Sequence, residues 1–177
     1  MNYYTALSNT YILMTGMKSM NKTKPLELFS NMRILKCQER ADILYVNYFN
    51  DFHGWQKELI LDYCDVSYVS AEVENSSWYI RRKVAQKGTD TDRWNLTNDI
   101  SANVRVAVVT YGTEAMRQAM KDDDSKMVRA AIYRHTTDED LRDHVASGRK
   151  WSPSFIRTVK NNATNSKHIA KAKLLNR

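Results

Sequence analysis

Basic residues near the C-terminus give this sequence of 177 residues its strongest chemical signal. Residues 149–177 hold eight Lys and Arg and no Asp or Glu, whereas the rest of the chain, with 19 basic and 20 acidic side chains, is nearly neutral. The eight are Arg149, Lys150, Arg157, Lys160, Lys167, Lys171, Lys173 and Arg177. Such a run binds the phosphates of DNA or RNA, or an acidic protein, and its alternative is a solvated tail. Helical spacing predicts that Lys160, Lys167 and Lys171 lie on one side.

A second basic cluster lies in the middle of the chain, beside aromatic residues. Its members are Arg81, Arg82, Lys83 and Lys87, with Trp78, Tyr79 and Trp94 nearby in sequence. Aromatic rings interleaved with Arg can stack bases and hold phosphates, which is the chemistry of single-strand binding. The alternative is that the rings fill the core while the charges form a solvated face.

Patterns that would indicate catalysis or metal binding are missing from the sequence. The four histidines lack metal-ligand spacing, and Cys37 and Cys64 are too few for a disulfide framework or a zinc site. We expect both cysteines to be small core residues. No nucleophile elbow, phosphate loop or dinucleotide fingerprint occurs. The sequence therefore predicts no cofactor, no metal and no enzymatic activity, the alternative being a DNA glycosylase-like or lyase-like site assembled from distant parts of the chain.

The basic side chains belong to a pattern that recurs every 24 residues. An apolar or long residue followed by a basic anchor occurs at Met32-Arg33, Gln56-Lys57, Ile80-Arg81, Val104-Arg105 and Val128-Arg129, with a displaced last copy at Ile156-Arg157. A hydrogen-bond acceptor stands six residues before each of the five regular anchors, as Glu27, Asp51, Asn75, Asp99 and Asp123. We expect each anchor to pair with this acceptor inside the protein. The anchors and their acceptors then form a ladder of polar contacts inside the protein. We prefer this interpretation to one in which the anchors form a surface stripe that binds phosphates.

The residues around the anchors predict two helices in each copy. Apolar residues at helical spacing follow the anchor for about two turns, until Gly88 or Gly112 ends the helix by adopting a positive φ. The next residue is Asp65, Thr89, Thr113 or Thr137, which we expect to cap a second, shorter helix. In that helix Met116, Met120, Leu141 and Val145 are expected to face the core. Such units bury their apolar faces only by stacking.

The segments Asp99 to Val108 and Asp123 to Ile132 combine an acceptor, a Val-Arg anchor and an apolar helix. They resemble HEAT-like repeats, and the short period resembles the leucine-rich repeat variant with its 24-residue units. The resemblance implies an all-α fold, a right-handed α-solenoid of five to six short repeats built from an α-helix and a short α or 3-10 helix. It also implies an Asp-to-Arg ladder and a scaffold or interaction role, and it transfers no catalytic residue.

Three parts of the chain are expected: an N-terminal cap over residues 1–24, five repeats over 25–147, and a divergent last repeat with a basic segment over 148–177. No apolar stretch is long enough for a membrane span and no export signal is evident, which predicts a cytoplasmic protein. The composition suggests a bacterial protein, or a phage protein in its host. We expect a non-enzymatic binding or adaptor protein that engages a macromolecular partner. This partner is expected to be another protein. Its alternative is DNA or RNA binding through the basic C-terminal end, including DNA repair.

Overall fold

The computed structural model describes residues 38–147 and 151–175. Within these ranges the chain forms eleven α-helices and one 3-10 helix, and no strand occurs there. This confirms the all-α class for the described residues. The expected N-terminal cap and the first copy of the pattern, with Glu27 and Arg33, lie outside them.

Long and short helices alternate along the chain. The long ones have ten residues each: α4 (Gly54–Tyr63), α6 (Trp78–Lys87), α8 (Ala102–Tyr111), α10 (Lys126–His135) and α12 (Pro153–Asn162). The short ones are α5 (Val66–Ser70), α7 (Asp90–Asn95), α9 (Glu114–Ala119) and α11 (Glu139–Ala146). The ends are α3 (Gln38–Tyr48), which leads into a 3-10 turn at Phe49–Asp51, and α13 (Ser166–Leu174).

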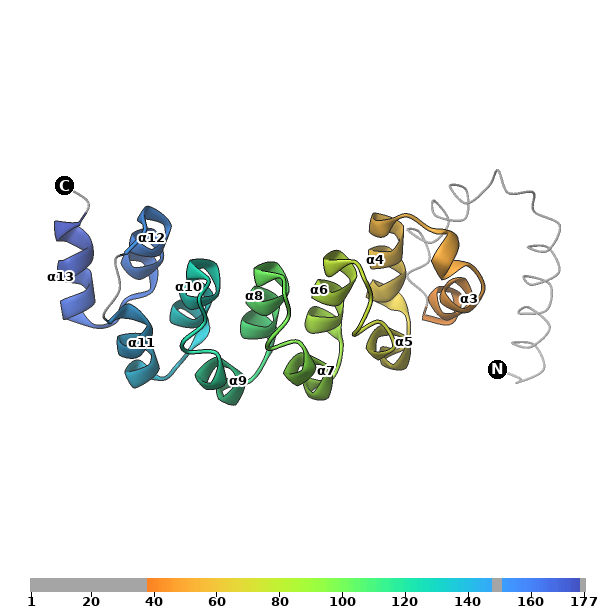
Figure 1. Cartoon of the computed structure of the whole chain (residues 1–177), viewed down its shortest axis with the longest axis horizontal. Coiled ribbons are helices and arrows are strands. Elements are labelled where there is room, and N and C mark those ends of the chain that lie inside the picture. Colours follow the sequence, from red (N-terminus) through yellow and green to blue (C-terminus); the bar gives the residue numbers. More distant parts are fainter. Residues whose placement is uncertain (1–37, 148–150, 176–177) are drawn as a thin grey trace, which may run out of the picture.

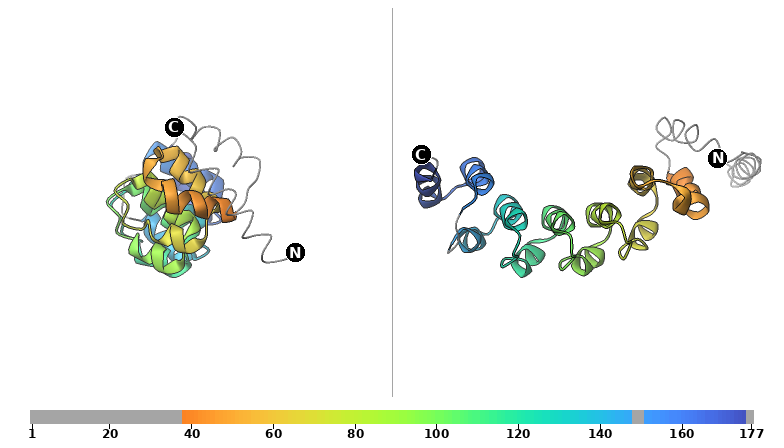
Figure 2. Two further views of the ribbon diagram at one scale, coloured as in Figure 1. Left: turned by 90° about the vertical axis from the view of Figure 1, so that its right-hand side faces the viewer. Right: turned by 45° about the horizontal axis from the view of Figure 1, so that its top comes forward.

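The helices stand in two rows that follow a shallow arc (Figure 1). The long helices α4, α6, α8, α10 and α12 make up the inner row, and the short helices lie on the outer side of the arc (Figures 1 and 2). Each long helix packs against the next long helix in chain order. A long helix, the connection that leads into it and the short helix that follows it are together called a unit below.

The core runs between the two rows. The third and seventh residues of the long helices are one helical turn apart and face the short helices. They include Ile80, Val84, Val104, Val108, Val128 and Ile132, none of which is more than 1% exposed. The short helices contribute Met116, Met120, Leu141 and Val145, whose expected core positions are confirmed. Cys64 is half-buried and packs against this core, as expected, and Cys37 lies outside the described residues.

The capping residues of the short helices agree with expectation in three units out of four. Asp65, Thr89 and Thr113 accept hydrogen bonds from backbone N–H groups of the helices they precede. The prediction for Thr137 was wrong, because Asp138 caps α11 by accepting from the N–H groups of Asp140 and Leu141. A carboxylate that accepts two such bonds is a stronger cap than a hydroxyl, and the connection before α11 is one residue longer.

Gly88 and Gly112 end α6 and α8, but for a different reason than expected. Their φ angles are −71° and −86°, so neither adopts the positive φ that the sequence suggested. A Cβ on Gly88 would lie 2.7 Å from the backbone oxygen of Val84, and one on Gly112 would lie 2.6 Å from the sulfur of Met116. Glycine is required there because the backbone of the long helix's last turn and a side chain of the following short helix both lie too close for a Cβ.

The last copy of the pattern is shifted by one residue from its expected place. Ser125 caps α10 and Ser152 caps α12, so Ile156 stands at the fourth position that Arg129 holds in α10. Ile156 is buried and Arg157 is exposed. The basic residue of this copy is therefore outside the anchor position.

Candidate binding surface

Each anchor arginine of the middle units ties two consecutive units together. The Nε and Nη2 atoms of Arg105 donate to the carboxylate of Asp123 at 2.7 and 3.0 Å, while its Nη1 donates to the backbone oxygen of Asp99 at 2.8 Å. Arg81 repeats this arrangement, with the carboxylate of Asp99 at 2.6 and 2.9 Å and the backbone oxygen of Asn75 at 2.7 Å. The arginines thus clamp their own unit to the following one.

This ladder differs from the expected one in its side-chain partner. The residue six positions before the anchor was expected to bind it through its side chain, but it does so through its backbone oxygen. The carboxylate that binds Arg105 comes instead from Asp123, 18 residues later in the chain. The Asp99 carboxylate is already engaged by Arg81 and by the backbone N–H of Ser101, which is 2.8 Å away.

The ladder holds ionised groups on both sides. Burial alone would raise the pKa of Asp99 and of Asp123, but hydrogen bonds from their arginines and from nearby backbone N–H groups outweigh burial and lower both pKa values. The hydrogen bonds that Arg81 donates to Asp99 raise the pKa of Arg81, and those that Arg105 donates to Asp123 raise the pKa of Arg105. Since each cation faces an anion, these arginines serve the fold and offer little charge to a ligand.

A second series of arginines, which sequence reasoning missed, caps the long helices. Arg93, Arg117 and Arg142 of the short helices donate from Nε to the carbonyl oxygens of Ala85, Val109 and Tyr133 near the C-terminal ends of α6, α8 and α10. Each also pairs with an acid three residues earlier: Asp90, Glu114 or Glu139. The recurring order of an acid followed by Arg three residues later could have revealed this series.

Two carboxylates of α4 pair with three cations of the central basic cluster. Arg82 reaches Glu58 at 3.3 Å, and Lys83 reaches Asp62 at 2.9 Å. Lys87 lies 3.9 Å from the same Asp62 carboxylate. With Arg81 bound to Asp99, every cation of the cluster has an acidic partner.

The aromatic residues beside this cluster are largely outside the core. The guanidinium carbon of Arg82 lies 5.7 Å from the ring centroid of Trp78 and 5.9 Å from that of Tyr79. The two rings stack on each other with centroids 3.7 Å apart. Tyr79 is 47% exposed and Trp94 45%. The rings therefore contribute to the protein surface.

The C-terminal basic residues lie on two helices. Arg157 and Lys160 belong to α12, and Lys167, Lys171 and Lys173 belong to α13, all of them exposed. Lys167 and Lys171 lie one turn apart on α13, while Lys160 is on a separate helix, which corrects the expectation of one shared side. No carboxylate among the described residues pairs with any of these five. Arg149, Lys150 and Arg177 lie outside the described residues.

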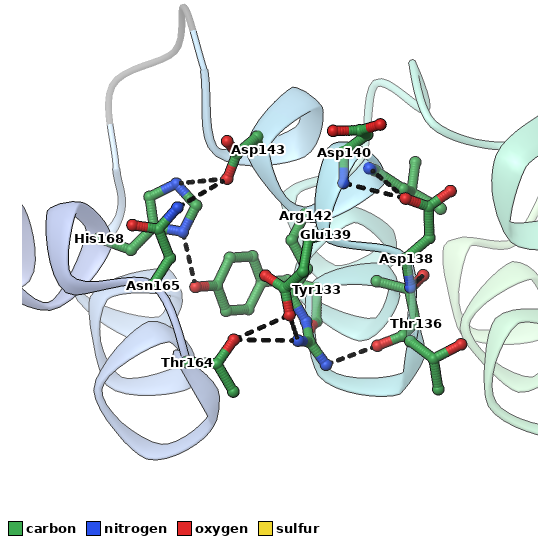
Figure 3. A network of polar contacts seen from close by, with 12 residues as sticks. Tyr133, Thr136, Asp138, Glu139, Asp140, Arg142, Asp143, Thr164, Asn165 and His168 are labelled. Carbon is green, nitrogen blue, oxygen red and sulfur yellow. Dashed lines mark hydrogen bonds and ion pairs between the residues drawn. The ribbon is translucent and has the colours of Figure 1, made fainter.

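A network of polar contacts fixes α13 to the preceding unit (Figure 3). The hydroxyl of Tyr133 lies 3.0 Å from Nδ1 of His168, whose Nε2 lies 3.3 Å from the carboxylate of Asp143. Asn165 donates to the same carboxylate at 3.3 Å. Trp151 donates from its indole nitrogen to the backbone oxygen of Ala146 at 2.9 Å.

Tyr, His and Asp side chains in hydrogen-bond contact can transfer protons, but the burial of Tyr133 in this network favours a structural role. Tyr133 has no exposed area, and burial raises the pKa of its hydroxyl to about 12. At neutral pH the hydroxyl therefore keeps its proton for the hydrogen bond to His168. The network holds the terminal helix in place, with the phenol of Tyr133 buried inside it.

The thiol of Cys64 is equally unsuited to nucleophilic chemistry. Burial, followed by the charge of Asp42, raises its pKa to about 12. The thiolate is the nucleophilic form of cysteine, and it is scarcely populated at neutral pH with this pKa. Within the described residues no group of three or more His, Cys, Asp or Glu is placed to hold a metal ion.

A shallow pocket of about 250 Å³ lies beside the ladder and is lined by Thr97, Asn98, Arg105, Asp123 and Asp124. Arg105 binds both carboxylates of this pocket. The pocket thus holds one guanidinium and two carboxylates that already bind each other. No helix in the described ranges has the length and apolar character that crossing a membrane requires.

Three of the four large exposed apolar side chains on the long helices lie in one row, and the fourth, Tyr111, is the last residue of α8. Trp55, Tyr79 and Met127 are each the second residue of a long helix, in α4, α6 and α10, and are 60%, 47% and 50% exposed. The second, fifth and ninth residues of these helices share one face, opposite the buried third and seventh residues. We call this face the inner surface, because it is turned away from the core and belongs to the helices that form the inner row of the arc (Figure 1).

Charge is unevenly distributed along the inner surface. Its acidic residues are Glu58 and Asp62 of α4, and both are engaged by α6. The helices α6, α8, α10 and α12 contain no Asp or Glu. Arg134 and Arg157 are exposed on α10 and α12. The surface is thus apolar and neutral over α4 to α8 and basic toward α12.

No protein-family model, curated protein or solved structure matches this chain.

Proposed function

We propose that this protein is a right-handed α-solenoid of five to six short HEAT-like repeats that acts as a non-enzymatic binding or adaptor protein. Its inner surface engages a protein partner in the cytoplasm of a bacterium or, for a phage protein, of the host. The observation that carries this proposal is the row of Trp55, Tyr79 and Met127 at the same position of three long helices.

The types of these side chains support a protein partner. Tyr, Trp and Met are enriched in protein interfaces, and Trp and Tyr carry a large part of the binding energy. The charged residues of the middle units, in contrast, serve contacts inside the protein. The inner surface therefore keeps large apolar groups in reach of a partner while the arginine series hold the units in register.

Affinity capture with matched variants tests this proposal. The full chain, a Trp55→Ala/Tyr79→Ala variant and a Trp94→Ala/Ile100→Ala variant would each be used as bait in native bacterial lysate. Trp94 and Ile100 are exposed but lie off the inner surface, so they control for general loss of apolar area. We expect the full chain to capture specific proteins that the Trp55→Ala/Tyr79→Ala variant no longer captures and the Trp94→Ala/Ile100→Ala variant still captures. Recovery of the same proteins by all three baits would contradict the proposal.

A second function, DNA or RNA binding at the C-terminal end, is favoured by the five exposed cations of α12 and α13. It predicts binding of a labelled oligonucleotide that weakens steeply with salt, because each neutralised phosphate releases a counterion. Replacing Lys160, Lys167, Lys171 and Lys173 by Glu should abolish this binding. Unchanged binding would remove the alternative, and a DNA-repair activity would additionally require base release from the oligonucleotide.

A further inference from the structure

We infer that the partner of the inner surface is an acidic peptide segment, with large apolar side chains at one end and carboxylates at the other. This inference rests on the proposed function and specifies the chemistry of its partner. It is argued from the order of apolar and charged residues along the inner surface.

The apolar part of the surface extends from α4 to α10. Trp55 and Tyr79 occupy adjacent units, and Met127 follows two units after Tyr79. Val106 and Ala130, at the fifth positions of α8 and α10, are half-buried and add smaller apolar area. A partner gains binding energy here by burying aromatic or large aliphatic side chains.

The charged part of the surface follows at α10 and α12. Arg134 and Arg157 are exposed there, and no acidic residue on α6, α8, α10 or α12 can neutralise them. The acids Glu58 and Asp62 are already paired with Arg82 and Lys83. A basic segment would therefore be repelled by these two arginines. Carboxylates of an acidic segment would instead bind them, since a guanidinium can donate two hydrogen bonds to one carboxylate.

The dimensions of the surface suit a short segment. Packed helices lie about 8 to 10 Å apart, so the span from α4 to α12 is on the order of 36 Å. An extended chain covers about 3.3 Å per residue, and about 11 residues span this surface. Each unit thus corresponds to about three residues of the segment.

A nucleic-acid strand suits the inner surface less well than a peptide does. Each strand of duplex DNA carries one charge per about 3.4 Å, which places two or three phosphates over every unit. Arg134 and Arg157 supply two exposed cations at one end of the surface. The cations around α6 are already paired with Glu58, Asp62 and Asp99.

Selection from a phage-displayed library of random 16-residue peptides tests the inference on the full chain. We expect enriched peptides that combine aromatic residues with a run of Asp and Glu. Their affinity should fall at least tenfold with Arg134→Glu/Arg157→Glu and also with Trp55→Ala/Tyr79→Ala. It should stay unchanged with Gln118→Glu, which adds negative charge at an exposed position of the short helix α9. Replacing the peptide's acidic residues by Lys should restore binding to the Arg134→Glu/Arg157→Glu variant.

Three results would overturn the inference in different ways. Peptides that depend on Trp55 and Tyr79 but lack acidic residues, and that bind the charge-reversed variant equally well, would refute the acidic partner and leave the proposed function standing. Peptides whose binding depends on neither Trp55 nor Tyr79 would refute both the acidic partner and the proposed function of the inner surface. A 20-residue oligothymidylate that binds through Arg134 and Arg157 more tightly than the peptides would assign the surface to nucleic acid.

Discussion

The middle units and the C-terminal end use arginine and lysine in opposite ways. In α6 and α8, Arg81 and Arg105 each bind an aspartate of the following unit. In α12 the corresponding position holds Ile156, and the basic side chain beside it, Arg157, is exposed. The same type of residue therefore holds units together in one region and remains accessible to a partner in the other.

The difference depends on whether an acceptor stands in the next unit. The carboxylates that bind Arg81 and Arg105 lie 18 residues later in the chain. Eighteen residues after Arg157 the chain has Leu175, which cannot accept a hydrogen bond from its side chain. The end is held instead by the contacts that His168 makes with the buried Tyr133 and with the exposed carboxylate of Asp143.

The largest effect is expected from removing a ladder arginine. Arg105→Ala leaves the carboxylate of Asp123, whose side chain is 7% exposed, without its cation. Breaking a buried pair in this way costs about 3 to 5 kcal/mol of the free energy of unfolding. Urea denaturation followed by circular dichroism would measure the loss. Arg157→Ala is the matched control and should change the free energy by about 0.5 kcal/mol or less. Equal losses for both variants would erase the contrast between the two regions.

Acid is expected to weaken the middle units next. The pKa values of Asp92, Asp99 and Asp123 are lowered in the folded state, because hydrogen bonds to each outweigh its burial. A carboxylate with a depressed pKa contributes stability above its unfolded value of about 3.9, and this contribution is lost as pH falls through the folded pKa. The free energy of unfolding should therefore drop below about pH 4. In Asp99→Asn/Asp123→Asn the drop should be shallower, and an identical pH profile would contradict the role of these two groups.

A smaller and more local effect is expected at the C-terminal end. Tyr133→Phe removes the hydroxyl that bonds to Nδ1 of His168, at a cost of about 1 kcal/mol. Amide hydrogen exchange should become faster in α13 and stay the same in α6 and α8. Tyr111→Phe, at an exposed tyrosine of α8, is the control. Faster exchange throughout the chain would show that α13 is not held separately by this network.

The sequence predicted the helices and the core because both depend on local spacing. Val104, Val108 and Met116 recur at helical intervals, and their burial follows from that period. The caps at Thr89 and Thr113 are equally local, since each hydroxyl binds a backbone N–H three residues ahead.

Contacts between units could not be read from the same spacing. The Asp123 carboxylate is as regularly spaced from Arg105 as Asp99 is, and the stacking of the units decides which of the two it binds. The inner surface was missed for a related reason. Trp55, Tyr79 and Met127 differ in residue type, and the packing of the long helices is what places them on one face.

The central claim, that Arg81 and Arg105 each bind the unit after their own, is tested most directly by a double-mutant cycle on the free energy of unfolding. Arg105→Ala would be combined with Asp123→Ala in one cycle and with Asp99→Ala in another. The structure predicts a coupling of about 2 kcal/mol for Arg105 with Asp123, and less than about 0.5 kcal/mol for Arg105 with the Asp99 side chain. A larger coupling to Asp99 than to Asp123 would contradict the account.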